Sequence, residues 1–305
     1  MEGEKIIIID KTLTVLWERY NERFINNISL IRELASLLYK LGSSYIEITP
    51  EIYNNIHPLP NDIEFIVNVN KHINIPSGDS VENYIRKNKD FSKESKIRIS
   101  GLCDLMFFDY KEKLLKIKDF FGKDTELEFD DYYGLGTALS LEWLLLGGTT
   151  IVTTFSGIGR YTALEEILCA LKFIENNKID CDTKILPQIL RVFESITNED
   201  IPNNKSIIGK KIFEVESGIH VDGISKDSKC YEPFSPIEVG MERKIIIGKH
   251  SGRKSIELKL KELNINLEVT KFKIVLDKLR SESIKRSREL KDQEIYDICK
   301  GIGVI

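Results

Sequence analysis

Short β-branched apolar runs alternate with helical segments along the first 177 residues, and this alternation is the strongest constraint on the fold. Apolar residues recur at helical spacing over 28–41, and this segment ends at Gly42, a common helix terminator. Strands that alternate with helices form a parallel sheet with right-handed crossovers. The sequence therefore predicts an α/β barrel of the TIM type, with its chemistry at the C-terminal ends of the strands. The runs typical of buried strands are 5–9, 45–49, 64–69, 97–100, 127–129 and 150–155.

The number of strands is lower than a closed barrel needs. Six runs are recognisable, whereas a barrel of this type has eight strands. Residues 70–96 are polar and irregular. Two interpretations stay open: the barrel is shortened and incomplete, or short strands in this segment have no recognisable pattern. We therefore expect a degenerate, shortened barrel over 1–177, a connecting segment over 178–215 and a mixed, mainly helical subdomain over 216–305.

Composition excludes several classes of protein. A net charge of −4 gives no reason to expect a nucleic acid or membrane partner. The chain has no apolar run of about 18 residues, as a membrane span requires, and its opening residues lack the pattern of a secretion signal. Its five cysteines have no paired spacing, which argues against a disulfide framework or a zinc site. We expect a cytoplasmic protein.

A second feature, the stretch 216–253, is dense in residues with acid–base chemistry. His220 precedes Val-Asp-Gly, and Tyr231 follows ahead of two prolines. Imidazole is the commonest general acid or base in enzymes, and a tyrosine hydroxyl can deliver a proton beside it. A loop with two hydrogen-bonded histidines, His220 and His250, is the structural alternative. The pattern predicts His220 and Tyr231 as candidate catalytic residues.

The stretch also carries a resemblance. From about 195 to 252 the sequence is similar to the segment that follows the barrel in the homocitrate synthase and isopropylmalate synthase family, as in NEDIPNNKSIIGKK at 198–211. It most resembles the nitrogen-fixation type of homocitrate synthase. The resemblance implies an acyltransferase that condenses acetyl-CoA with 2-oxoglutarate and water to give homocitrate and CoA, for nitrogenase iron–molybdenum cofactor biosynthesis. In this family the subdomain covers the partner's active site, where His220 and Tyr231 match its proton-handling residues.

The barrel half departs from the family at its metal and substrate positions. The family's first strand leads into Asp-Thr-Thr-Leu-Arg-Asp, whose Arg binds the oxo acid and whose last Asp binds a divalent metal. Thr14 and Val15 stand there, and valine has no lone pair to offer a cation. Glu128 and Asp130 replace two metal-binding histidines, and Ser156 replaces an asparagine. The resemblance implies no metal on this chain, although Glu128 and Asp130 stay open as an oxygen-only site because alternate strand residues point the same way.

This asymmetric loss implies a partner. Some members of the family consist of two polypeptides, alpha and omega, and the sequence resembles the omega type. In such a hetero-oligomer the alpha subunit would bind Mg²⁺ or Mn²⁺ and the 2-oxo acid, while this chain donates His220 and Tyr231 and holds no cofactor. Two alternatives stay open: an acyltransferase active by itself, and a non-catalytic regulatory partner of a homocitrate or isopropylmalate synthase.

Two basic segments have a structural and a ligand-binding interpretation. At 248–253, Gly-Lys-His-Ser-Gly-Arg, Lys249 and Arg253 suit a phosphate of CoA. Alternatively, Ser251 caps the helix that begins near Arg253, and we favour this interpretation because serine is common at helix N-caps. The cluster at 285–288 is interpreted as a solvated helix face, with ligand contact as its alternative.

Overall fold

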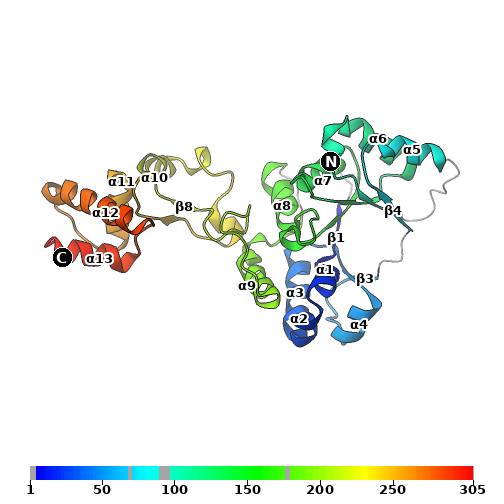
Figure 1. The fold of residues 1–305 in the computed structure, drawn as a ribbon, viewed down its shortest axis with the longest axis horizontal. Helices are drawn as coiled ribbons and strands as arrows, with labels where there is room; N and C mark the ends of the chain where they lie inside the picture. The colour runs from blue at the N-terminus through cyan, green and yellow to red at the C-terminus, as the bar shows by residue number, and fades with distance from the viewer. Residues whose placement is uncertain (1–4, 68–70, 89–96, 176–178, 305) are drawn as a thin grey trace. The chain divides into compact units, whose positions relative to one another are not determined.

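The computed structural model describes residues 5–67, 71–88, 97–175 and 179–304 (Figure 1). The chain divides into two compact units. We call Met1–Gly209 the barrel unit and Lys210–Ile305 the C-terminal unit.

The barrel unit contains a seven-stranded parallel sheet with the order β3-β2-β1-β7-β6-β5-β4. The pairing of β1 with β7, the last strand of the unit, brings the start and end of this unit together, as in a barrel. The edges are β3 and β4, and no ladder joins them within the residues that the structure describes. The predicted incomplete TIM-type barrel is thus confirmed. The strands are β1 (Ile7–Asp10), β2 (Tyr45–Ile48), β3 (Phe65–Val67), β4 (Lys71–Ile75), β5 (Ile97–Gly101), β6 (Glu126–Phe129) and β7 (Thr150–Thr153).

Helices cover the sheet, with α1–α4 gathered near β3 and α5 and α6 near β4 (Figure 1). The longest of them, α3, buries Ile31, Leu34 and Leu38 at helical spacing and ends at Gly42, whose φ of 137° favours glycine. The helices are α1 (Thr12–Arg19), α2 (Asn21–Asn26), α3 (Ile28–Leu41), α4 (Pro50–Ile56), α5 (Ser80–Lys87), α6 (Tyr110–Phe121), α7 (Gly136–Leu145), α8 (Leu164–Cys169) and α9 (Leu186–Thr197).

The segment 70–96, which has no clear pattern, contains β4 and α5. Both interpretations of it therefore hold in part: a short strand lies there, and the barrel is also incomplete. In β4, Ile73 and Ile75 are buried while His72 and Asn74, which precede them in alternation, are exposed. This alternation is too short to be distinguished from a polar loop by sequence alone. Residues 70 and 89–96 of the segment, and residues 68 and 69 of the strand predicted over 64–69, lie outside the described residues.

The C-terminal unit is mainly helical, as predicted. A two-stranded parallel sheet, β8 (Glu214–Val215) with β9 (Lys244–Ile245), precedes most of its helices. Its core is a cluster of buried apolar residues that includes Ile247, Leu260 and Leu279. The helices are α10 (Gly218–Lys226), α11 (Arg253–Glu262), α12 (Phe272–Arg286) and α13 (Asp292–Gly301).

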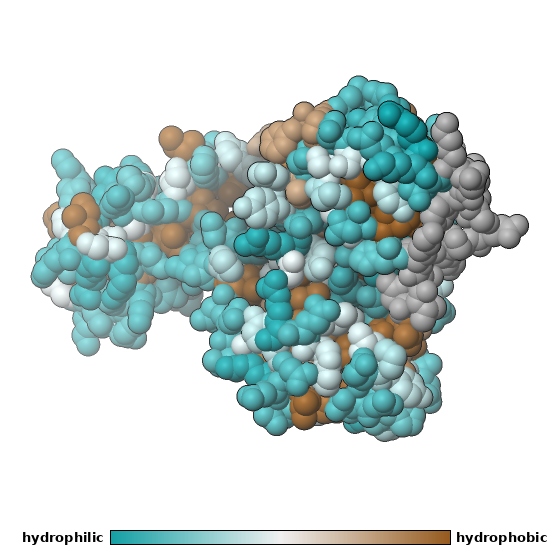
Figure 2. Space-filling view, turned by 45° about the vertical axis from the view of Figure 1, so that its right-hand side comes forward, coloured by the Kyte–Doolittle hydropathy of each residue, from teal (hydrophilic) through white to brown (hydrophobic). Residues whose placement is uncertain are grey.

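Hydrophilic residues cover most of the face drawn in Figure 2, and hydrophobic residues form separate patches on it. Among the described residues, every helix is too short or too polar to cross a bilayer.

Candidate functional site

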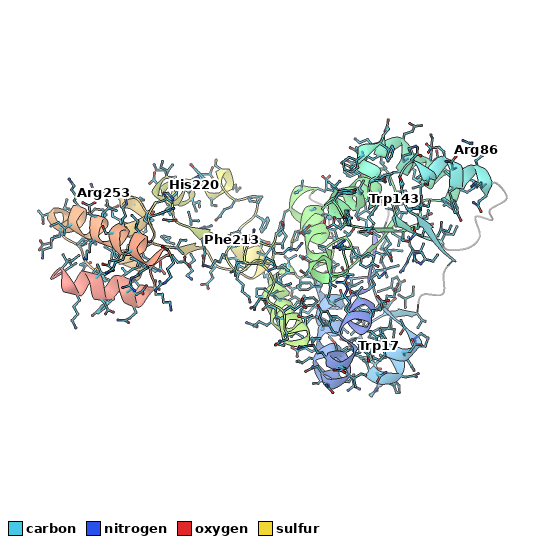
Figure 3. The ribbon with its side chains drawn as sticks, in the orientation of Figure 1. Trp17, Arg86, Trp143, Phe213, His220 and Arg253 are labelled. Atoms are coloured by element: carbon cyan, nitrogen blue, oxygen red, sulfur yellow. The ribbon has the colours of Figure 1, made fainter. Side chains whose placement is uncertain are left out.

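The structure brings His220 and Tyr231 together. His220 lies on α10 (Figure 3), and after α10 a short 3-10 helix, Ser228–Cys230, turns the chain back. The ring centroids of His220 and Tyr231 are 5.7 Å apart, with the planes inclined by 58°. His220 is exposed and Tyr231 is 46% exposed, so both polar groups can meet a substrate.

Gly223 sets the position of the Tyr231 ring. It lies three residues after His220, and residues at this spacing share one face of a helix. A Cβ atom at Gly223 would overlap the ring carbons and the hydroxyl oxygen of Tyr231. The ring therefore lies directly against the helix backbone. A glycine inside a helix lowers the stability of the helix by about 1 kcal/mol relative to alanine, so its presence there indicates a packing requirement. Sequence reasoning missed this role of Gly223.

Polar contacts fix the chain on both sides of Tyr231. Before it, the carboxylate of Asp227 accepts a hydrogen bond from the backbone N–H of Lys229 at 3.1 Å. After it, Glu232 forms a bidentate pair with Arg243, with distances of 2.7 Å and 2.6 Å. This pair ties the residue next to Tyr231 to the segment that enters β9. The tyrosine is thus held by a turn, a glycine and an ion pair.

The N-terminus of α10 is joined to the N-terminus of α11. Ser217 and Ser251 form an antiparallel bridge. A Cβ atom on Gly218 would lie 3.0 Å from the Cα atom of Gly252, so the two backbones are in close contact. The carboxylate of Glu216 accepts a hydrogen bond from the backbone N–H of His250 at 2.6 Å. His250 thus belongs to the support of this site through its backbone.

The prediction that Ser251 caps α11 is wrong. The N-cap is Gly252, without a side-chain cap. The Ser251 hydroxyl instead accepts a hydrogen bond from the backbone N–H of Gly248 at 2.9 Å and so closes the preceding turn. Arg253 pairs with Glu257 at 3.2 Å and lies over the ring of Phe272, so its guanidinium is already engaged within the unit.

Two arginines of the basic cluster at 285–288 form ion pairs within the unit. Arg286 and Arg288 both pair with Glu294, at 2.8 Å and 2.7 Å. All four residues of the cluster are exposed, as expected of a solvated helix face. Two of its three cations therefore already have a carboxylate partner.

In the barrel unit, the positions expected to have lost their ligands are buried. Val15 is 1% exposed and Thr14 donates a hydrogen bond to the backbone oxygen of Glu47. Both residues lie inside α1, and a Cβ on Gly159 would lie 3.1 Å from a methyl group of Val15. An apolar side chain thus fills the position where the family has a metal-binding carboxylate.

The Glu128 carboxylate is engaged by cations of the chain and does not fit a divalent metal site. One oxygen of Glu128 lies 3.0 Å from the Lys11 ammonium and 3.3 Å from the Arg98 guanidinium. The backbone of Asp130 forms a β-bridge with Tyr161, and one oxygen of its carboxylate is buried without a hydrogen-bond partner. No group of three or more potential ligands with metal-binding geometry occurs within the described ranges. Because cations of the chain already neutralise Glu128, the oxygen-only site left open by the sequence is not supported.

Two buried carboxyl groups were missed by sequence reasoning. Burial raises the pKa of Asp10 to about 7, although a hydrogen bond from the backbone N–H of Thr12 at 2.9 Å opposes the shift. Burial likewise raises the pKa of Glu165 to about 7, against the opposing effect of Lys205. Each group has one oxygen without a hydrogen-bond partner. In a sequence, such residues cannot be distinguished from solvated carboxylates.

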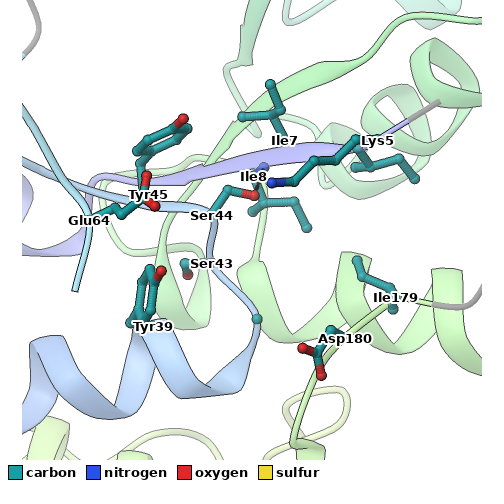
Figure 4. A pocket seen from close by; sticks show the side chains of 12 residues that line it. Lys5, Ile7, Ile8, Tyr39, Ser43, Ser44, Tyr45, Glu64, Ile179 and Asp180 are labelled. Atoms are coloured by element: carbon teal, nitrogen blue, oxygen red, sulfur yellow. Dashed lines mark hydrogen bonds between the residues drawn. The ribbon is translucent and has the colours of Figure 1, made fainter. Parts of the chain in front are cut away.

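A cavity of about 450 Å³ lies at the amino ends of β1, β2 and β3 (Figure 4). It is lined by polar groups that include Ser43, Tyr45 and Glu64. Barrel enzymes carry their chemistry at the opposite, carboxyl ends of the strands. The cavity is therefore separate from the positions at which the family binds metal and substrate.

Comparisons with known proteins identify relatives of this chain. The family model described as homocitrate synthase post-HMGL domain-like matches residues 207–287, which contain His220 and Tyr231. The chain is 30% identical to the homocitrate synthase omega subunit of Clostridium pasteurianum, over 98% of this chain and 97% of that one.

Other relatives match over part of their length. Homocitrate synthase AksA of Methanothermobacter thermautotrophicus is 34% identical over 59% of this chain, and the chain spans about half of that protein (46%). Among solved structures, an HMG-CoA lyase from Acenitobacter baumannii has a TM-score of 0.41 at 11% identity, over 65% of this chain and 93% of that one. The near full-length match to the omega subunit is decisive: the chain belongs to the homocitrate synthase family.

Proposed function

We propose that this chain is a subunit of a homocitrate synthase made of two kinds of polypeptide, and that it donates His220 and Tyr231 to an active site on an alpha subunit. The observation that carries the proposal is the contrast between its two units. His220 and Tyr231 lie together on an exposed surface, whereas the apolar Val15 and the ion-paired Glu128 occupy two metal positions of the barrel unit. The omega subunit relative supports the assignment to this type.

The reaction would join acetyl-CoA to 2-oxoglutarate. A proton leaves the acetyl methyl group, the resulting enol carbon attacks the 2-oxo carbon, and water then hydrolyses the thioester to release homocitrate and CoA. Mg²⁺ or Mn²⁺ on the alpha subunit would stabilise the developing alkoxide. On this chain, the His220 imidazole is suited to transfer a proton, and the Tyr231 hydroxyl to donate a hydrogen bond to the thioester oxygen as negative charge develops there. Homocitrate would serve nitrogenase iron–molybdenum cofactor biosynthesis.

The surroundings of the pair support contact with a second polypeptide. Ile219, next to His220, is 78% exposed. A polypeptide that covers the His220–Tyr231 pair would also bury this apolar side chain, which favours the complex. Covering the pair would also exclude water, which strengthens each hydrogen bond made to a charged intermediate.

The test is a condensation assay read by thiol release, with Mn²⁺ present. It has three arms: this chain alone, a paralogous chain with an intact barrel alone, and the two mixed. We expect activity only in the mixture. Activity of this chain alone would contradict the proposal, and full activity of the paralogue alone would leave this chain a regulatory role.

A further inference from the structure

Charged side chains meet on the inner face of the barrel unit's sheet. The register places Arg98 beside Glu126, and Ser100 beside Glu128. Through the pairs of β6 with β7, β7 with β1 and β1 with β2, Glu47 of β2 falls on this same face. All four charged residues are buried, and Arg98 is only 1% exposed.

Arg98 contacts all three carboxylates. Its guanidinium nitrogens lie 2.6 Å from Glu47, 2.9 Å from Glu126 and 3.3 Å from Glu128. Strands β1, β7 and β6 separate β2 from β5 in the sheet. An ion pair between β2 and β5 is therefore possible only because the sheet curls and the two strands face each other across its interior. Arg98 joins the two halves of a sheet whose edges are not paired in the described part of the chain.

Lys11 supplies a second cation at the carboxyl end. Its ammonium lies 3.0 Å from Glu128 and 4.0 Å from the ring centroid of Tyr161. Burial would lower the pKa of Lys11, yet the adjacent Glu128 carboxylate leaves that pKa raised, so the lysine stays charged. Two cations of the chain thus serve three buried carboxylates. Both cations contact the same oxygen of Glu128, so a metal ion could bind that oxygen only by displacing them.

We propose that Arg98 and Lys11 are the resident cations of the barrel unit: they pair with its inner carboxylates in place of the divalent metal that the family implies, and Arg98 braces the open sheet across its interior. The barrel unit then folds without metal and binds none at Glu128. The proposal does not depend on the roles of His220 and Tyr231, and its test does not use enzymatic activity.

The first test is a Mn²⁺ titration of the full chain followed by electron paramagnetic resonance. We expect no bound Mn²⁺ that depends on Glu128, and the same melting temperature with Mn²⁺ as with a chelator. Stoichiometric Mn²⁺ binding that Glu128→Gln abolishes would overturn the proposal.

The second test concerns the brace. Arg98→Met leaves three buried carboxylates without their shared partner, and we expect the melting temperature to fall by roughly 6 °C or more. The matched control is Arg288→Met, which removes an exposed arginine that also pairs with glutamate. Equal melting temperatures for the two variants would contradict the brace.

Two milder variants keep the test informative if Arg98→Met does not fold. Lysine in place of Arg98 keeps the charge but cannot reach three carboxylates at once, so Arg98→Lys should melt below Arg288→Lys. Lys11→Met removes a cation from Glu128 alone, so it should lower the melting temperature by less than Arg98→Lys does. A melting temperature of Arg98→Lys equal to that of the wild type would overturn the brace.

Discussion

The two units of this chain use polar residues in opposite ways. In the C-terminal unit, His220 and Tyr231 are exposed, and the contacts around them fix the backbone and leave the reactive groups free. In the barrel unit, Arg98 is buried together with the three carboxylates that it contacts. The first arrangement is suited to a substrate, and in the second the charged groups contact one another. The C-terminal unit thus exposes its candidate catalytic residues, whereas the buried charges of the barrel unit stabilise its fold.

The largest expected effect concerns the buried acids of the barrel unit. Because the folded pKa values of Asp10 and Glu165 are raised to about 7, their contribution to folding is complete below about pH 4 and is lost as the pH rises through about 7. Each group contributes up to about 4 kcal/mol to this change. We predict that the barrel unit is more stable to urea at pH 5 than at pH 8, and that Asp10→Asn reduces the difference.

Asp62→Asn is the control, because Asp62 is exposed. A stability that rises from pH 5 to pH 8 in the wild type, or an unchanged pH dependence in Asp10→Asn, would show that these carboxyls are not protonated in the folded protein.

The next effect concerns the glycine beneath the tyrosine. Gly223→Ala places a methyl group where the Tyr231 ring lies, so the ring must move. We predict that the activity of the mixed subunits falls at least about 100-fold, the magnitude of a lost proton-transfer group. Circular dichroism should show an unchanged helix content, because alanine favours helices.

Gly301→Ala is its control, since a Cβ atom at Gly301 meets nothing within 4 Å. If both alanine variants retained full activity, the position of Tyr231 would not matter for the reaction.

A smaller effect is expected from the ion pair that follows Tyr231. Glu232→Gln weakens a partly exposed pair with Arg243, which is worth about 1 kcal/mol or less. We predict that the activity of the mixed subunits falls by less than about tenfold. The control is Glu242→Gln, a change at an exposed position, which should leave the activity unchanged. A loss as large as that of Gly223→Ala would mean that the pair, and not the glycine, fixes the tyrosine.

Local patterns predicted the elements of the barrel unit well. The helix over 28–41 has the predicted bounds, because its apolar spacing and terminal glycine are both local signals. The strand predicted over 127–129 is β6, one residue longer at its start. The strand β4 was not recognised, because two isoleucines between polar residues are not a distinctive pattern. Element type therefore followed from sequence wherever the apolar run was strong.

Local patterns could not predict contacts between residues that are distant in the sequence. Nothing local to Arg98 indicates that it meets Glu47 across a curled sheet, or that Lys11 meets Glu128. His220 and Tyr231 were found because they belong to a recognisable motif, whereas Gly223 was noticed only as part of that motif. The motif thus indicated the candidate pair, and only the structure indicated what holds it in place.

The central claim is that His220 acts in an active site on another polypeptide. The most direct test compares His220→Ala with His250→Ala, both in this chain and both mixed with the intact-barrel paralogue. His250 is a suitable control because it is an exposed histidine of the same unit and contributes its backbone N–H to the fold. We predict that His220→Ala lowers thiol release at least about 100-fold while His250→Ala retains it. Equal activity of the two mixtures would contradict the donation of His220.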